Sequence, residues 1–127
     1  MITPSQLQQL ITFEQQVRIF HWQSRSFAEH KALGELYDGF GGLLDQFIET
    51  LLGREATRLQ FGALAFTLDQ YDGKRAAGVV DVYLINFASF LETELEQYLP
   101  ARSTELLNIR DEMLALVNRT LYLLSLS

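Results

Sequence analysis

Apolar residues recur along this chain at the three-to-four-residue spacing of amphipathic helices, and the pattern divides into four segments. The first segment begins at Pro4, a residue that suits the first turn of a helix, and continues to about Gln23. The second is expected over residues 27–53, because Ser26 is followed three residues later by a glutamate, which is the spacing of a capping box. Gly53 provides its C-terminal stop. The short polar turn between the two segments predicts an antiparallel hairpin.

The rest of the chain predicts a second hairpin. One helix is expected over residues 77–99, where Pro100 ends it, and another begins after Ser103, which caps it. The connection over residues 54–76 is long and partly apolar, so we expect it to pack across the bundle, with room for a short helix. Its apolar residues are Leu59, Phe61, Leu64, Phe66 and Leu68. Two antiparallel hairpins joined by one long crossover predict an all-α, ferritin-like four-helix bundle, with residues 1–127 as a single domain.

The second predicted helix carries two distinct stripes. At about 100° per residue, one face is apolar and is expected to face the core: Leu33, Tyr37, Phe40, Leu44, Phe47 and Leu51. The other face lies about a third of a turn away and is polar or small: His30, Gly34, Asp38, Gly41, Asp45 and Glu49. Because this second face lies beside the core stripe, its histidine and carboxylates should point sideways from the bundle, toward solvent or a second subunit.

Histidine and carboxylate together are ligands for iron, zinc or manganese. However, His30 and Glu49 are separated by roughly 28 Å along the helix, so they cannot hold one ion within one chain. Two copies of the helix that lie antiparallel about a two-fold axis would bring His30 of one copy to Asp45 and Glu49 of the other. His21, at the end of the first helix, is expected beside His30 across the short turn. The residues therefore predict a metal site shared by two subunits.

Glycines cluster where that axis would pass, near residues 38–39. They are Gly34, Gly39, Gly41 and Gly42. Each costs a helix about 0.5–1 kcal/mol relative to alanine, and close approach of a partner backbone is one reason to keep them. The alternative is that they break the helix over residues 38–42, which would undo the shared site. Asp38 lies in the same stretch and is a further candidate ligand, and Trp22 is expected to shield the site from bulk water.

Composition narrows the chemistry. The absence of cysteine excludes disulfides and thiolate metal sites and suits a reducing cytoplasm, where we expect the protein. A net charge of −6 makes non-specific DNA binding unexpected, and no apolar run approaches the roughly 20 residues of a membrane span. The Glu-x-x-His motif of di-iron bundles is missing, since Glu29 and His30 are adjacent, so the ordinary intra-subunit ferritin centre is not encoded. We expect no catalytic group other than the metal ligands.

Each part of the metal hypothesis also has a simpler interpretation. The pair formed by Asp45 and Glu49 is typical of a solvated helix face, and a lone histidine is commonly a surface or hydrogen-bonded residue. The common face of the histidine and the carboxylates favours the metal site. The alternative function is a non-catalytic helical bundle that serves as an assembly or interaction module.

The segment around the histidines resembles the ferroxidase segment of the Dps mini-ferritins, although the gap between the two histidines is shorter here. Three motifs carry the resemblance: Phe20-His21-Trp22, Phe27-x-x-His30 and Asp45-x-x-x-Glu49. The stretch over residues 18–32, together with Tyr37-Asp38, also resembles small proteins encoded by tailed phages. The specific part covers residues 17–53, and the remainder agrees only in its helix layout.

The resemblance implies a ferroxidase centre in which His21 and His30 come from one chain and Asp45 and Glu49 from its partner. Iron(II) would be oxidised there, typically with peroxide, and stored as mineral inside a cage of twelve subunits, for which a two-fold dimer is the minimum assembly. A further acidic ligand of the family is replaced here by Gly34, which favours iron, zinc or manganese binding over efficient turnover. These 127 residues contain no lysine-rich tail of the kind with which some Dps proteins bind DNA, so we do not expect that activity. A phage-encoded protein would act in the cytoplasm of a bacterial host.

Overall fold

The computed structural model describes all 127 residues and contains four long helices and no β-strand. The helices are α1 (Pro4–Gln23), α2 (Phe27–Glu55), α3 (Val79–Ser89) and α4 (Thr104–Ser125). The prediction of an all-α chain is confirmed. None of the helices has the length and apolar composition needed to cross a membrane.

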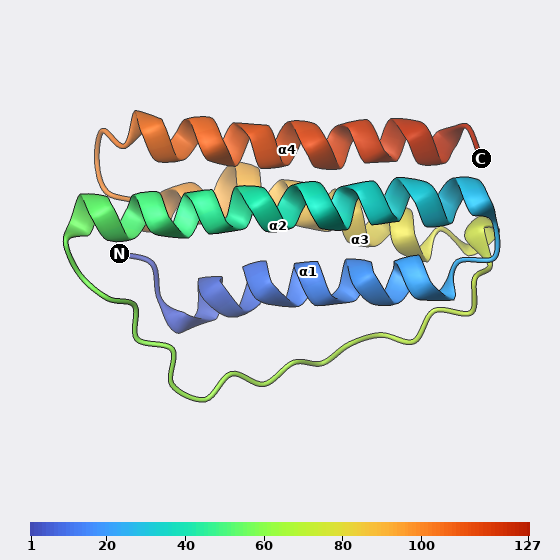
Figure 1. The fold of residues 1–127 in the computed structure, drawn as a ribbon, viewed down its shortest axis with the longest axis horizontal. Helices are drawn as coiled ribbons and strands as arrows, with labels where there is room; N and C mark the ends of the chain where they lie inside the picture. Colours follow the sequence, from blue (N-terminus) through green and yellow to red (C-terminus); the bar gives the residue numbers. More distant parts are fainter.

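The helices form two hairpins that pack side by side (Figure 1). Helices α1 and α2 run in opposite directions, as do α3 and α4, and the crossover between α2 and α3 returns along the outer side of α1 for the length of the molecule. Helix α2 packs against α1 on one side and against α4 on the other. This arrangement leaves one face of the α1–α2 hairpin open to solvent.

Local capping chemistry explains where the first two helices begin. Thr3 and Gln6 form a capping box around Pro4, as expected for a helix that starts there. Ser26 accepts a hydrogen bond from the backbone N–H of Glu29 at 3.1 Å, which caps α2. Helix α2 then continues without a break through its glycines and past Gly53 to Glu55, so the predicted stop at Gly53 is wrong. A left-handed residue, Ala56 with φ 50°, ends the helix instead.

The core follows the apolar stripe predicted for α2. Five residues of that stripe are buried, and Tyr37 is partly buried. Aromatic rings link the hairpins: Phe13 of α1 stacks on Phe87 of α3 with ring centroids 3.6 Å apart and meets Phe40 of α2 edge-on at 4.9 Å. Burying each such ring stabilises the fold by about 1.5–3 kcal/mol, so these contacts help to hold α1 against α2 and α3.

The third helix differs from its prediction, which was one continuous helix over 77–99. A 3₁₀ turn (Arg75–Ala77) precedes α3, and α3 ends at Ser89 in a π turn (Phe90–Glu94) followed by another 3₁₀ turn (Leu95–Tyr98). Apolar spacing alone cannot reveal this change, because the buried residues still alternate with exposed ones. Arg110 of α4 donates a hydrogen bond to the carbonyl of Leu91 at 3.0 Å, which satisfies a backbone group inside the π turn.

The crossover also differs from its prediction. It contains no helix before Arg75. Leu59 packs against the core as expected, whereas Phe61, Phe66 and Leu68 are at least 40% exposed. Polar anchors hold it in place: Gln16 of α1 donates a hydrogen bond to the carbonyl of Asp69 at 3.0 Å and accepts one from its N–H at 2.6 Å.

A buried polar contact fixes the end of the crossover. Tyr71 is 2% exposed and donates a hydrogen bond to Oε2 of Glu29 at 2.8 Å, beneath the first turn of α2. Burial and this hydrogen bond raise the pKa of Tyr71 above its usual value. The predicted capping box is therefore only half formed. The side chain of Glu29 does not bond back to Ser26, because its carboxylate is buried against Tyr71 and lies 3.6 Å from Arg75.

Candidate metal centre

The two histidines meet at the turn between α1 and α2. His21 lies in the last turn of α1 and His30 in the first turn of α2, and their rings stack with centroids 3.9 Å apart and planes inclined by 17°. The prediction that His21 lies beside His30 is confirmed. The short turn over residues 24–26 produces this contact, because it leaves the ends of the two helices next to each other.

Reciprocal hydrogen bonds orient both imidazole rings. Nδ1 of His21 lies 2.7 Å from the main-chain oxygen of His30, and Nδ1 of His30 lies 2.9 Å from the main-chain oxygen of His21. A carbonyl oxygen only accepts, so each Nδ1 carries a proton, and in the neutral ring the lone pair is then on Nε2. Neither Nε2 makes a hydrogen bond within the chain. A main-chain bond to the other ring nitrogen is the usual way to orient a metal-binding histidine.

Gly34 provides the space for one of these rings. A Cβ at Gly34 would lie 2.8 Å from Cε1 of His21 and 3.1 Å from its Nδ1, so His21 rests directly on the backbone of α2. Dps proteins have an acidic ligand at the position that corresponds to Gly34. In this chain the ring of His21 fills the space beside that position. A side chain here would displace the ring from its hydrogen bond to His30.

Two other glycines of α2 do not face a partner backbone, which was the role predicted for them. A Cβ at Gly39 would lie 2.9 Å from Cδ2 of Leu116, and one at Gly41 would lie 2.9 Å from Oε2 of Glu14. Like Gly34, these two glycines make room for side chains of their own chain. Of the four clustered glycines, Gly42 alone has no atom within 4 Å of its Cβ position and so remains open to a partner backbone.

The predicted carboxylates lie at the surface. Asp38, Asp45 and Glu49 are all exposed, which agrees with the prediction that this face points away from the core. Asp45 and Glu49 line a hollow of about 360 Å³ together with Glu14 and Phe61. Within one chain, no three histidine, aspartate or glutamate side chains come close enough to hold an ion together. The histidines and the carboxylates are thus two separate groups on the hairpin.

Glu14 is a functional candidate that the sequence pattern missed. Burial, and secondly the charge of Asp45, raise the pKa of this carboxyl, and Arg18 opposes the shift. Its position in the sequence could have indicated this, because Glu14 lies about two helical turns before His21 and therefore on the same side of α1. Arg18 lies between them, with its guanidinium 4.4 Å from the ring of Tyr37 and 5.6 Å from that of Trp22. Trp22 is 62% exposed and so does not shield the histidines within one chain, contrary to expectation.

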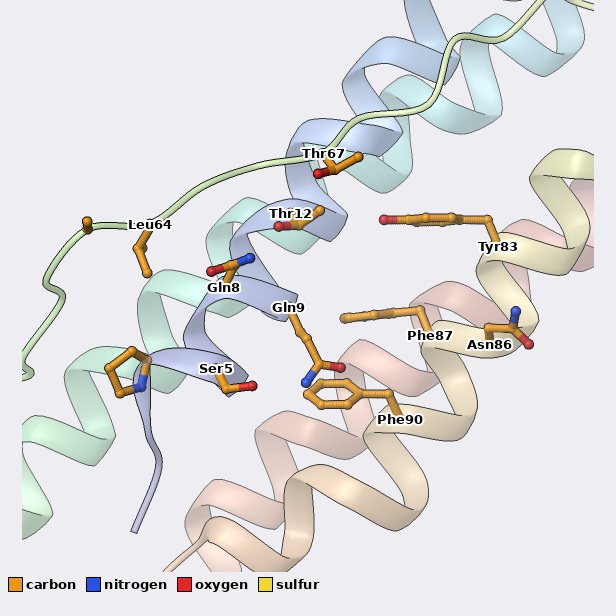
Figure 2. Close-up of a pocket in the computed structure, with 12 residues that line it drawn as sticks. Ser5, Gln8, Gln9, Thr12, Leu64, Thr67, Tyr83, Asn86, Phe87 and Phe90 are labelled. Carbon is orange, nitrogen blue, oxygen red and sulfur yellow. The ribbon is translucent and has the colours of Figure 1, made fainter.

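A second hollow on the opposite side of α1 has different chemistry. It measures about 810 Å³ and lies between α1, the crossover and α3, and Figure 2 shows their side chains facing one another across it. No charged residue lines it, and its polar groups are amides and hydroxyls, such as those of Gln8, Gln9 and Thr12. Burial, with a contribution from Asp69, raises the pKa of Tyr83 in its wall to about 12. The hollow suits a neutral molecule and offers no ligand set for a metal.

The chain belongs to DUF5856, a family of unknown function whose family model matches residues 21–124. The match begins at His21 and includes His30, Asp45 and Glu49. No curated protein and no solved structure matches the chain.

Proposed function

We propose that this chain is a Dps-like metal-binding protein whose site is shared between two subunits related by a two-fold axis. The observation that carries the proposal is the pair formed by His21 and His30. Both rings are oriented by main-chain carbonyls, and both Nε2 atoms are left free as ligands. Paired histidines with this arrangement fit a transition metal better than they fit a solvated surface.

The carboxylates supply the other half of the donor set. Asp45 and Glu49 lie on adjacent turns of α2, exposed and without hydrogen bonds or ion pairs in the chain. An antiparallel copy of α2 would bring them to the histidines of the first chain, and the symmetry would generate two equal sites. Imidazole with carboxylate suits iron, with zinc or manganese as alternatives. Asp38 lies close to the axis, where it would be an outer ligand or a neighbour of the site.

Iron oxidation extends the same proposal. Four helices in two hairpins with a long crossover support a ferritin-like bundle, the fold in which Dps proteins oxidise iron. Iron(II) would be the substrate and hydrogen peroxide the electron acceptor, which is reduced to water. The assembly would be a two-fold dimer at least, or a dodecameric cage as in Dps proteins.

A second candidate function is a non-catalytic assembly module of phage origin, and the surface of α3 favours it. Val79, Val82 and Ile85 follow one another at helical spacing and are 44%, 57% and 54% exposed. An apolar stripe of this kind often marks a protein–protein contact. Replacing Val82 and Ile85 by lysine would change the assembly under this function, whereas replacing the histidines would not.

Metal uptake tests the first function. The metal-free protein is loaded with Fe(II) without oxygen, passed through a sizing column, and analysed for metal in each fraction. We expect iron to elute with a dimer or a larger assembly, and His30→Ala to lose it, whereas Gln46→Ala, an exposed neighbour on α2, keeps it. If the wild-type protein retains neither iron, zinc nor manganese, the metal function is wrong.

A further inference from the structure

A carboxylate of α1 occupies a position equivalent to that of His21, on the other half of the hairpin. His21 rests on the backbone of α2 at Gly34, and Glu14 rests on it at Gly41, with Oε2 2.9 Å from the Cβ position. The two glycines lie about two turns apart on one face of α2, and the two α1 residues lie about two turns apart on one face of α1. The spacing between His21 and Glu14 on α1 thus matches the spacing between the two glycines on α2.

The carboxylate of Glu14 has no partner within the chain. It makes no hydrogen bond and no ion pair, although Arg18 lies one turn away on the same helix. Arg18 is directed instead at the rings of Tyr37 and Trp22. The hollow that Glu14 shares with Asp45 and Glu49 is otherwise walled by apolar side chains and contains no basic residue. In an isolated chain the carboxylate of Glu14 is thus left without a direct hydrogen-bond or ion-pair partner.

The two-fold arrangement of the proposed function provides the missing partner. Its axis passes near residues 38–39, almost midway between Gly34 and Gly41. The turn that carries Gly41 in one chain then faces the turn that carries Gly34 in the other. Because Glu14 rests on Gly41 and His21 rests on Gly34, the axis brings Glu14 of one chain toward His21 of the other. The same operation brings Asp45 toward His30.

We propose that Glu14 is a further metal ligand, supplied by the chain that supplies Asp45 and Glu49 to the histidines of its partner. This inference rests on the proposed function. It raises the number of carboxylates at each site to three, set against two imidazoles. Such an oxygen-rich donor set favours iron(II) or manganese(II) over zinc, which prefers fewer ligands and more nitrogen or sulfur.

A mixed dimer assigns Glu14 to one chain of the pair. One chain carries His21→Ala and His30→Ala and so supplies only carboxylates, and the other carries Asp45→Asn and Glu49→Gln and so supplies only histidines. The dimer purified with two affinity tags has one complete site. Glu14→Gln is then introduced into either chain, and Fe(II) affinity is measured by anaerobic titration calorimetry. Glu35→Gln, an exposed carboxylate on the α4 side of α2, is the control.

We expect Glu14→Gln to weaken Fe(II) binding by about tenfold or more in the carboxylate chain and to have no effect in the histidine chain. Equal weakening from both chains would overturn the proposal, because it would show an indirect effect on the fold. Unchanged affinity in both would overturn it while the proposed function stands. If the wild-type dimer binds no metal, the proposed function fails first, and Glu14 fails with it. Urea unfolding of each variant verifies that the chains remain folded.

Discussion

Helix α1 presents two surfaces with different chemistry. Toward the open face of its hairpin with α2 it carries Glu14, Arg18 and His21, and glycines of α2 make room for Glu14 and His21. Toward α3 it carries uncharged residues such as Gln8 and Gln9, and a hollow of about 810 Å³ separates the helices. Charged side chains of α1 therefore gather on one side of the helix, while the other side packs through aromatic rings and lines a hollow with uncharged groups only.

The largest effect is expected on the free energy of unfolding, from a substitution in the aromatic packing between α1 and α3. Phe87→Ala removes the ring that stacks on Phe13 and opens a cavity between α1 and α3, so it should lower the free energy of unfolding by about 3–5 kcal/mol. Urea denaturation monitored by circular dichroism measures this change. Fe(II) binding below the unfolding transition should stay near the wild-type value. A parallel loss of metal affinity would show that the two surfaces of α1 are not independent.

A smaller effect, on metal affinity, is expected to distinguish two glycines of α2. Gly34→Ala places a methyl group 2.8 Å from Cε1 of His21 and should displace the ring, which would weaken metal binding by about 10–100-fold. Gly53→Ala, where no atom lies within 4 Å of the new methyl group, should leave metal binding unchanged and stabilise the helix by about 0.5–1 kcal/mol. Calorimetric titration with Fe(II) and thermal unfolding measure the two quantities. Equal metal affinities in both variants would contradict the role assigned to Gly34.

The smallest expected effect is a pH-dependent change in stability that comes from Glu14. Because burial raises the folded-state pKa of Glu14, its ionised form destabilises the metal-free fold, and this penalty is absent below the unfolded pKa of about 4.3. Glu14→Gln should therefore match the wild type at about pH 4 and become more stable as pH rises through the raised pKa. The gain should be below about 1 kcal/mol, since water screens a half-exposed carboxylate. Urea unfolding across this pH range measures the gain, with Glu35→Gln as the charge control. If the gain is absent at neutral pH, burial does not disfavour the ionised carboxylate of Glu14.

Local chemistry made much of the fold predictable. The helix starts predicted at Pro4, Ser26 and Ser103 are all confirmed, and the first two have caps that involve only neighbouring residues. The predicted side-chain cap of α4 is wrong, because the hydroxyl of Ser103 donates to the carbonyl of Pro100 at 2.7 Å instead. The contact between His21 and His30 was predictable for the same reason, because a short turn leaves few alternatives. The irregular end of α3 and the course of the crossover depend on partners that are distant in sequence, such as Arg110 and Gln16, so periodicity could not reveal them.

The candidate site was predictable only in part. The face of α2 that carries His30 and Asp45 follows from helical periodicity, and the exposure of its carboxylates is confirmed. The glycines were assigned to a partner backbone, but Gly34 and Gly41 receive side chains of α1. Periodicity within one helix cannot distinguish a neighbouring helix of the same chain from a second chain. Glu14 was missed for the same reason, since its relation to Asp45 depends on how the two helices pack.

A metal site shared between two chains has a direct consequence for a dimer of two different variants. Each parent variant, one without His21 and His30 and the other without Asp45 and Glu49, should bind no Fe(II) as a homodimer. The dimer that contains one chain of each kind should bind half as much iron as the wild-type dimer, because one of its two sites is complete. Elemental analysis of the sized, doubly tagged dimer gives this ratio. A mixed dimer without bound iron, beside a wild-type protein that retains it, would contradict the shared site.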